Sequence, residues 1–266
     1  MTKLQVRQVT PDIWMLEFPV GQAYAVRLPD GWALVDTGLG GPGRAEEVLE
    51  ALAALPGPGE LREIVLTHCH LDHRGNAAAL AGATGARVLA GAGDAAVIRG
   101  EAPEAPPVLE EWEVPVFESV QGVIAGAGAP PPPPCRVDRE LADGDVLDWG
   151  REVRIVGVPG HTPGSIALHL PAARVLFTGD TVARHPEVML GPFNLDRSRA
   201  VASFRRQAEL DVDVACFGHG APLVGGAGKT LREAVERLAA RGVREVIMKG
   251  SASGRFPLAT ARWSCS

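Results

Sequence analysis

The stretch IVLTHCHLDHRGN (Ile64–Asn76) places three histidines and an aspartate within six residues, directly after an apolar run, in a chain with only 7 histidines. At this composition the pattern His-x-His-x-Asp-His would arise by chance about once in a million positions. Imidazole nitrogens and carboxylate oxygens are ligands that zinc prefers. The alternative is a polar turn in which Asp72 caps the next helix. Capping by one residue leaves the others available, so the stretch predicts a metal site.

Three further apolar runs also end at a histidine or an aspartate: EVRIVGVPGHT, RVLFTGDT and DVACFGHG. Loops beyond strand ends are where folds present functional side chains, and the glycines in these runs let the backbone turn sharply. One ion needs three or four protein ligands, so a larger set indicates two ions that share a bridging ligand. The candidate ligands are His68, His70, Asp72, His73, His161, Asp180 and His219.

The composition is ordinary for a globular protein, with 46% hydrophobic and 22% charged residues in a chain of 266. Layered folds often reach this size as one unit, so we predict a single domain over residues 1–250. The tail, residues 251–266, shows no periodicity and is a candidate for disorder.

The net charge and the cysteine spacing limit the classes of partner and the cellular compartment that we expect. The net charge of -6 gives no electrostatic footprint for nucleic acid, and no apolar run approaches the ~20 residues that cross a bilayer. The 4 cysteines show no paired spacing, and the N-terminus lacks the pattern of a secretory signal. We therefore expect a cytoplasmic protein that acts on a small molecule, without nucleic-acid or membrane partners. The oligomeric state stays open.

Hydrophobic periodicity alternates between strands and helices along most of the chain. The first forty residues predict short antiparallel strands, and later apolar runs predict buried strands that alternate with helices. Helices are expected over residues 43–55, 75–84, 199–210 and 229–242.

Residues 101–135 interrupt this alternation with many prolines, which disfavour both helices and central strands. We predict a surface insertion. Its large apolar residues, Trp112 and Phe117 among them, are too many for an idle linker. The segment is therefore expected to form a flap over a pocket, or else to pack on the flank of the domain.

The residues quoted above resemble the metallo-β-lactamase fold superfamily of metallohydrolases. The motif matches at His68 to His73, the later ligands follow in the family's order, and the likeness spans roughly Ala23 to Pro222, including Asp36-Thr37-Gly38. The resemblance implies a four-layer αββα sandwich of the α+β class with two Zn2+ ions at one edge of its sheets. By the same resemblance, His68, His70 and His161 hold one ion, Asp72, His73 and His219 hold the other, and Asp180 bridges them.

The expected chemistry is attack by a hydroxide that two cations share, because zinc can lower the pKa of bound water to about 7. Asp72 has a second expected role, in which it orients the hydroxide and passes a proton to the leaving group. Asp36 is expected either to support a ligand or to belong to a simple turn. Cys69 and His169 are expected to face away from the metal. Substrate contacts are predicted for Phe18, Trp112, Phe117, His185, Met189 and Phe193.

The substrate is narrowed by comparison with branches of the superfamily. True β-lactamases of the superfamily usually lack an aspartate at the position of Asp180, so β-lactam hydrolysis is expected only as a lesser activity. The C-terminal region is shorter than the helical region that glyoxalase II has there. Acyl-homoserine lactonases often use a tyrosine near the bridging aspartate, whereas the single tyrosine here is Tyr24. We expect a zinc hydrolase that cleaves a lactone or thioester. The alternatives are glyoxalase II-like activity, a mononuclear iron persulfide dioxygenase, or a binding module without catalysis.

Overall fold

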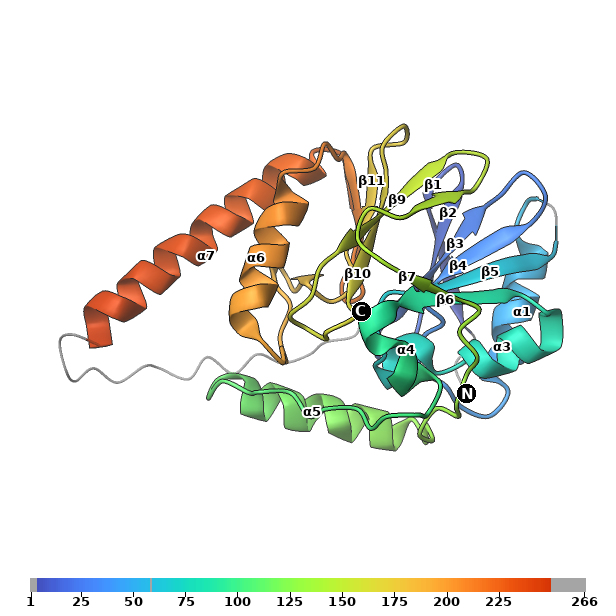
Figure 1. Cartoon of the computed structure of the whole chain (residues 1–266), viewed down its shortest axis with the longest axis horizontal. Coiled ribbons are helices and arrows are strands. Elements are labelled where there is room, and N and C mark those ends of the chain that lie inside the picture. The colour runs from blue at the N-terminus through green and yellow to red at the C-terminus, as the bar shows by residue number, and fades with distance from the viewer. Residues whose placement is uncertain (1–3, 58, 250–266) are drawn as a thin grey trace.

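The computed structural model describes residues 4–57 and 59–249, with side chains through residue 240. Two β-sheets pack face to face, and helices cover the outer face of each (Figure 1). This arrangement confirms the expected αββα sandwich. The predicted tail, residues 251–266, lies outside the described residues. Within the described part of the chain, no helix is long and apolar enough to span a bilayer.

The first sheet contains seven strands in sequence order, antiparallel at its start and parallel from β4 onward. Its strands alternate their buried side chains between the two faces, as Leu34 and Val35 show by packing into different cores. The strands are β1 (Gln5–Thr10), β2 (Ile13–Glu17), β3 (Gln22–Arg27), β4 (Trp32–Val35), β5 (Leu61–Leu66), β6 (Arg87–Gly91) and β7 (Arg139–Leu141).

The second sheet has six strands in the order β15-β14-β11-β10-β9-β8, and a separate hairpin joins β12 to β13. Only β11 and β14 pair in parallel in this sheet. The strands are β8 (Val146–Asp148), β9 (Glu152–Gly157), β10 (Ile166–Leu170), β11 (Val175–Phe177), β12 (Val182–Arg184), β13 (Val188–Leu190), β14 (Val214–Cys216) and β15 (Leu223–Val224).

Three hydrophobic cores fill the spaces between the four layers. One lies between the first sheet and its helices, one between the sheets, and one beneath α6 and α7. Burial of this apolar area is the main favourable term in folding. The helices are α1 (Arg44–Ala54), α2 (Leu71–Arg74), α3 (Ala77–Thr84), α4 (Ala92–Ile98), α5 (Glu113–Gly126), α6 (Arg197–Ala208) and α7 (Ala227–Lys249).

The four predicted helices appear as α1, α3, α6 and α7, but the proline-rich insertion differs from expectation. It contains α5, which lies along one side of the sandwich (Figure 1). Pro115 stands in the first turn of α5, where backbone N–H groups have no partner within the helix, so its missing N–H costs little. The strands β1, β7, β12, β13 and β15 and the short helices α2 and α4 were not predicted from the sequence.

The first sheet brings the functional loops to one edge. In parallel strands the carboxyl ends lie side by side, so the residues after β4, β5 and β6 meet there. The ends of β11 and β14 do the same in the second sheet. Segments far apart in the sequence therefore converge where the two sheets face each other.

Candidate metal centre

All seven predicted ligand side chains converge at this edge of the sandwich. They form three overlapping groups whose potential ligand atoms lie within 4.8 Å of one another. The first group is His68, His70 and His161, and the second group is Asp72, His73 and His219. The remaining group, His68, His73 and Asp180, overlaps both. That these residues bind metal stays a prediction.

The first group presents three imidazole nitrogens to one point. His70 Nδ1 lies 3.1 Å from His68 Nε2 and 2.9 Å from His161 Nε2. Two nitrogens each about 2.1 Å from one tetrahedral zinc would be ~3.4 Å apart, so the spacing is close to what a shared cation requires.

The second group combines two histidines with a carboxylate. Asp72 Oδ2 lies 3.3 Å from His219 Nε2 and 3.7 Å from His73 Nε2. A divalent cation placed among these atoms would meet one anionic and two neutral donors, a set that zinc favours.

Asp180 lies between the two groups. Its Oδ2 atom is 3.0 Å from His219 Nε2 and 3.6 Å from His161 Nε2, and its Oδ1 atom is 3.3 Å from His73 Nε2. One carboxylate therefore faces both candidate ion positions, as a bridging ligand would.

Unpartnered buried atoms support the fit of a cation. Among the described residues, His73 Nε2 and Asp180 Oδ1 are buried without a hydrogen-bond partner, although they face each other. Buried polar atoms are normally paired, because leaving one unpaired costs about 1–3 kcal/mol. A cation between these two atoms would satisfy both.

The two groups differ in charge. Burial holds the pKa of His68 and His70 below the ordinary value and lowers the pKa of His161 to about 3. In the second group Asp180 and Asp72 outweigh burial, so the pKa of His73 is raised and that of His219 reaches about 10. Without metal, the first group is neutral at pH 7 and the second carries protons that a cation must displace.

Asp36 supports the ligands from the end of β4. Its Oδ2 atom accepts hydrogen bonds from His73 Nδ1 (2.9 Å) and Thr67 Oγ1 (2.8 Å), and its Oδ1 atom accepts one from Thr67 N (2.7 Å). Thr67 Oγ1 also lies 3.0 Å from His68 Nδ1. A proton held on His73 Nδ1 leaves Nε2 available to a cation. Of the two roles expected for Asp36, the structure favours the supporting one.

Cys69, His169 and Tyr24 are buried in the fold. Cys69 packs in the core beneath α1 and α3, and His169 is buried in β10 near the backbone oxygen of Asp211. Neither belongs to a candidate metal group. Tyr24 donates a hydrogen bond of 2.7 Å to Phe217 O and packs between the sheets, so its hydroxyl is committed to the fold.

The apolar insertion connects to the site through the loop after β13. Phe117, half-buried on α5, packs edge to face against Phe193 with ring centroids 5.2 Å apart. The buried carboxylate of Glu113 accepts a hydrogen bond of 3.2 Å from Phe193 N. In the same loop, Leu195 N donates to His161 O (3.2 Å). The contacts therefore run from α5 to a candidate ligand.

The other predicted substrate residues have varied surroundings, and their substrate contacts stay predictions. Trp112 is 45% exposed at the start of α5, Met189 is half-buried in β13, and His185 is exposed between β12 and β13. Phe18 is buried in the core beneath α1 and α3, where its ring lies against Gly38.

Sequence reasoning missed several residues of the site. Glu104 of the insertion places Oε1 3.8 Å from His70 Nε2, and burial raises the pKa of Glu104. Asp94, at the start of α4, contacts both loops of the first group. Asp94 follows the apolar strand β6, so the rule that flagged the other strand ends could have found it. No motif marks Glu104.

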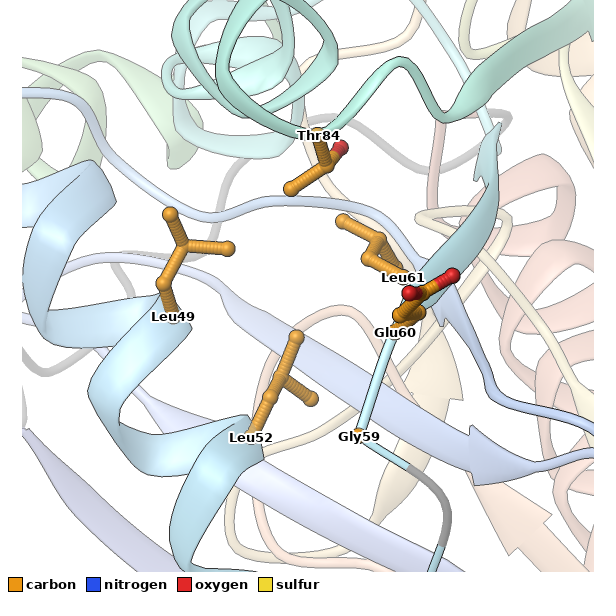
Figure 2. A pocket seen from close by; sticks show the side chains of 6 residues that line it. All are labelled: Leu49, Leu52, Gly59, Glu60, Leu61 and Thr84. Atoms are coloured by element: carbon orange, nitrogen blue, oxygen red, sulfur yellow. The ribbon is translucent and has the colours of Figure 1, made fainter.

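A cavity of about 300 Å³ lies away from these residues. Figure 2 shows Leu49 and Leu52 of α1 pointing across it toward Leu61 at the start of β5. Gly59, Glu60 and Thr84 complete the lining, which includes none of the predicted site residues.

Comparison with known proteins gives several relatives. The chain is 35% identical to a hydroxyacylglutathione hydrolase of Cereibacter sphaeroides over 123 residues, 46% of this chain and 34% of that protein. It is 26% identical to a probable metallo-hydrolase of Bacillus subtilis, covering 85% and 89% of the two chains. It is 32% identical to an acyl-coenzyme A thioesterase of Gallus gallus, covering 55% and 50%. The chain thus spans about a third of the first relative's length.

Structural comparison and a family model agree on the family. A metallo-beta-lactamase family protein from Thermus thermophilus superposes with a TM-score of 0.64 at 26% identity, covering 91% of this chain and 82% of that one. The family model described as the metallo-beta-lactamase superfamily matches residues 17–219, which include all seven candidate ligands. The chain therefore belongs to the metallo-beta-lactamase superfamily.

Proposed function

We propose that this protein is a hydrolase that holds two divalent cations, zinc in the simplest case, and cleaves a thioester bond in a small acyl substrate. The observation that carries the proposal is the position of Asp180, whose carboxylate faces both groups of candidate ligands. A single ion would leave one group of buried donors unused. When bound, the cations would lower the pKa of a coordinated water and polarise the substrate carbonyl.

Asp72 is suited to move a proton. It engages His219 and His73 through Oδ2. We assign its Oδ1 atom to orient the attacking water and to pass a proton to the leaving sulfur, as a positioned carboxylate can. The nearby histidines hold the pKa of Asp72 below its ordinary value, so the group is ionised and can accept a proton at neutral pH.

The insertion supplies an apolar wall for the acyl group. Val116, Phe117 and Val120 are half-buried on α5, and Phe117 contacts Phe193 near the His161 loop. An acyl chain against this wall would be removed from water, which stabilises binding by about 25 cal/mol per Å² of apolar surface. A lactone would use the same site, but no tyrosine hydroxyl is available to assist, because that of Tyr24 donates to Phe217 O.

The names of two relatives, a hydroxyacylglutathione hydrolase and an acyl-coenzyme A thioesterase, favour a thioester over a lactone. Glyoxalase II-like hydrolysis is included in this proposal. Lesser β-lactam hydrolysis and persulfide oxidation by a single iron are the competing activities. The cytoplasmic location, the small-molecule partner and the absence of nucleic-acid and membrane partners stay predictions.

The test is a turnover screen of the zinc-loaded protein against acetyl and hexanoyl thioesters of N-acetylcysteamine, a hexanoyl lactone, a β-lactam, and a persulfide with oxygen. We expect the hexanoyl thioester to be the best substrate, with two zinc ions per chain by elemental analysis. Asp180→Ala should lose metal and turnover together. Best turnover on the lactone or the β-lactam, or one iron per chain with oxygen consumption, would refute the proposal.

The acyl wall has its own variant. Phe117→Ala should raise KM for the hexanoyl thioester and leave the acetyl thioester unchanged. Val123→Ala is the matched control, because Val123 lies on the same helix but is 46% exposed. Equal effects of the two substitutions would place the acyl group elsewhere.

A further inference from the structure

A buried carboxylate outside the predicted ligand set joins the two loops that form the first histidine group. Asp94 is 1% exposed in the first turn of α4. It accepts hydrogen bonds from Cys69 N (2.9 Å), Thr162 Oγ1 (2.6 Å) and Gly164 N (2.7 Å). Charge-assisted hydrogen bonds of this kind are about twice as strong as neutral ones.

The donors are next to candidate ligands in the chain. Cys69 lies between His68 and His70, and Thr162 directly follows His161. One side chain therefore sets the separation between the loop after β5 and the loop after β9. That separation determines how His161 Nε2 approaches His70 Nδ1, which is now at 2.9 Å.

Close backbone packing prevents the second loop from taking another position. A Cβ atom on Gly164 would lie 2.2 Å from Asp94 N, and one on Gly91 would lie 2.0 Å from Gly164 O. The Thr162 hydroxyl is also held by Ser165 Oγ at 2.7 Å. The loop is thus pressed against the first turn of α4, and Asp94 pairs the polar groups that this contact buries.

We propose that Asp94 is a positioning residue for the first cation, acting through the spacing of His161 from His68 and His70. The inference rests on the proposed metal binding, and it goes further by assigning to the first ion a support that the second ion does not share. Among the described residues, the hydrogen bonds of Asp94 reach none of Asp72, His73 and His219, whereas Asp36 bonds to His73 directly. Loss of Asp94 should therefore weaken one ion much more than the other.

The decisive variant is Asp94→Asn, which keeps the size of the side chain but turns one acceptor into a donor that faces other donors. We expect zinc affinity at the first group to fall about 10–100-fold, as for other groups that hold metal ligands in place. The second group should keep affinity close to that of the wild type. Chelator competition on the demetallated protein measures both affinities. Anomalous diffraction at limiting zinc identifies which position has lost occupancy.

Two controls separate positioning from general damage. Asp138 lies away from the ligands, and its carboxylate accepts a hydrogen bond of 2.7 Å from Val88 N on β6. Asp138→Asn should leave the zinc affinities of both groups unchanged. Thr162→Val removes one donor to Asp94, while Thr162→Ser retains it. Only the valine variant should lower affinity at the first group. These two variants decide the question if Asp94→Asn does not fold.

The outcomes that overturn the inference are distinct from those that overturn the proposed function. A wild-type protein that takes up no zinc refutes both. A wild type with two zinc ions, together with an Asp94→Asn variant that holds both with unchanged or equally reduced affinity, refutes the positioning role alone.

Discussion

Replacement of Asp36 by asparagine tests how the cluster prepares its histidines. Asp36 is 3% exposed and has a φ of 60°, a left-handed conformation that asparagine tolerates well. The backbone should therefore be unaffected. The amide retains one acceptor oxygen for Thr67 N but places its NH2 group opposite His73 Nδ1 and Thr67 Oγ1, where the carboxylate now accepts two hydrogen bonds.

The substituted amide can bond to His73 only if Nδ1 becomes an acceptor. In the metal-free protein the raised pKa of His73 means that both ring nitrogens carry a proton, so the ring must give up its Nδ1 proton and keep the one on Nε2, the atom that faces Asp72 and Asp180. In the metal-free protein this exchange replaces a charge-assisted hydrogen bond by a neutral one and costs about 1–3 kcal/mol. At about 2–4 °C per kcal/mol for a chain of this size, Tm should fall by roughly 2–12 °C.

The Asp36→Asn substitution should reduce zinc affinity more than it reduces the stability of the fold. A proton on Nε2 excludes that nitrogen from a cation, so we expect zinc affinity at the second group to fall about 10–100-fold. Chelator competition with Asp36→Asn, wild type and the Asp138→Asn control measures this loss, and calorimetry of the demetallated proteins measures Tm. If Asp36→Asn lowers Tm but binds zinc like the wild type, Asp36 stabilises the fold and does not set the tautomer of His73.

The charges and close contacts of the cluster also determine how proton release accompanies zinc binding and how the centre responds to a change at Gly218. At pH 7 the first zinc equivalent should release few protons, because burial keeps the histidines of the first group neutral. The second zinc equivalent should release about two protons more than the first, because Asp180 and Asp72 raise the pKa of His73 and His219. Zinc affinity at the second group should therefore rise with pH up to about 10. Indicator dyes in weak buffer measure the release, and equal release by both equivalents would contradict it. Gly218→Ala should abolish turnover, since the new Cβ would lie 2.0 Å from Asp180 Oδ1 and 2.9 Å from His73 Cε1; a variant with normal zinc content and rate would show that the centre can shift to make room.

The convergence of the candidate ligands could be predicted because it depends on short-range patterns. Each apolar run ends at a polar residue after a strand, and parallel strands place their carboxyl ends at one edge. His161 and His219 therefore come close to the motif after β5 although they are far away in the sequence. The layered fold followed from the family resemblance, and the alternation of buried residues in the strands agrees with it.

Features that depend on tertiary contacts could not be predicted in this way. The helix α5 forms in a proline-rich segment because Pro115 occupies the first turn and the buried Glu113 fastens that turn to the backbone of Phe193. Asp94 follows the apolar strand β6, so its position could be selected from the sequence, but its contacts could not. Its role becomes visible only when the loop carrying Thr162 and Gly164 packs against it.

The protonation states of the histidines in the motif also could not be predicted from the sequence. His70 and His73 lie three positions apart, yet the pKa of His70 is lowered and that of His73 is raised. Burial acts on both rings, so burial cannot explain the difference. His73 faces Asp180, which comes from the other sheet, Asp72 of the motif itself, and Asp36 at the end of β4, and these carboxylates raise its pKa. Asp180 reaches this ring only because the two sheets pack together, and Asp36 only because β4 pairs with β5 in the first sheet, so the division of the cluster into a neutral half and a protonated half is a property of the fold. A sequence motif identifies the candidate donor residues, but it does not show which of them must lose a proton before a cation can bind.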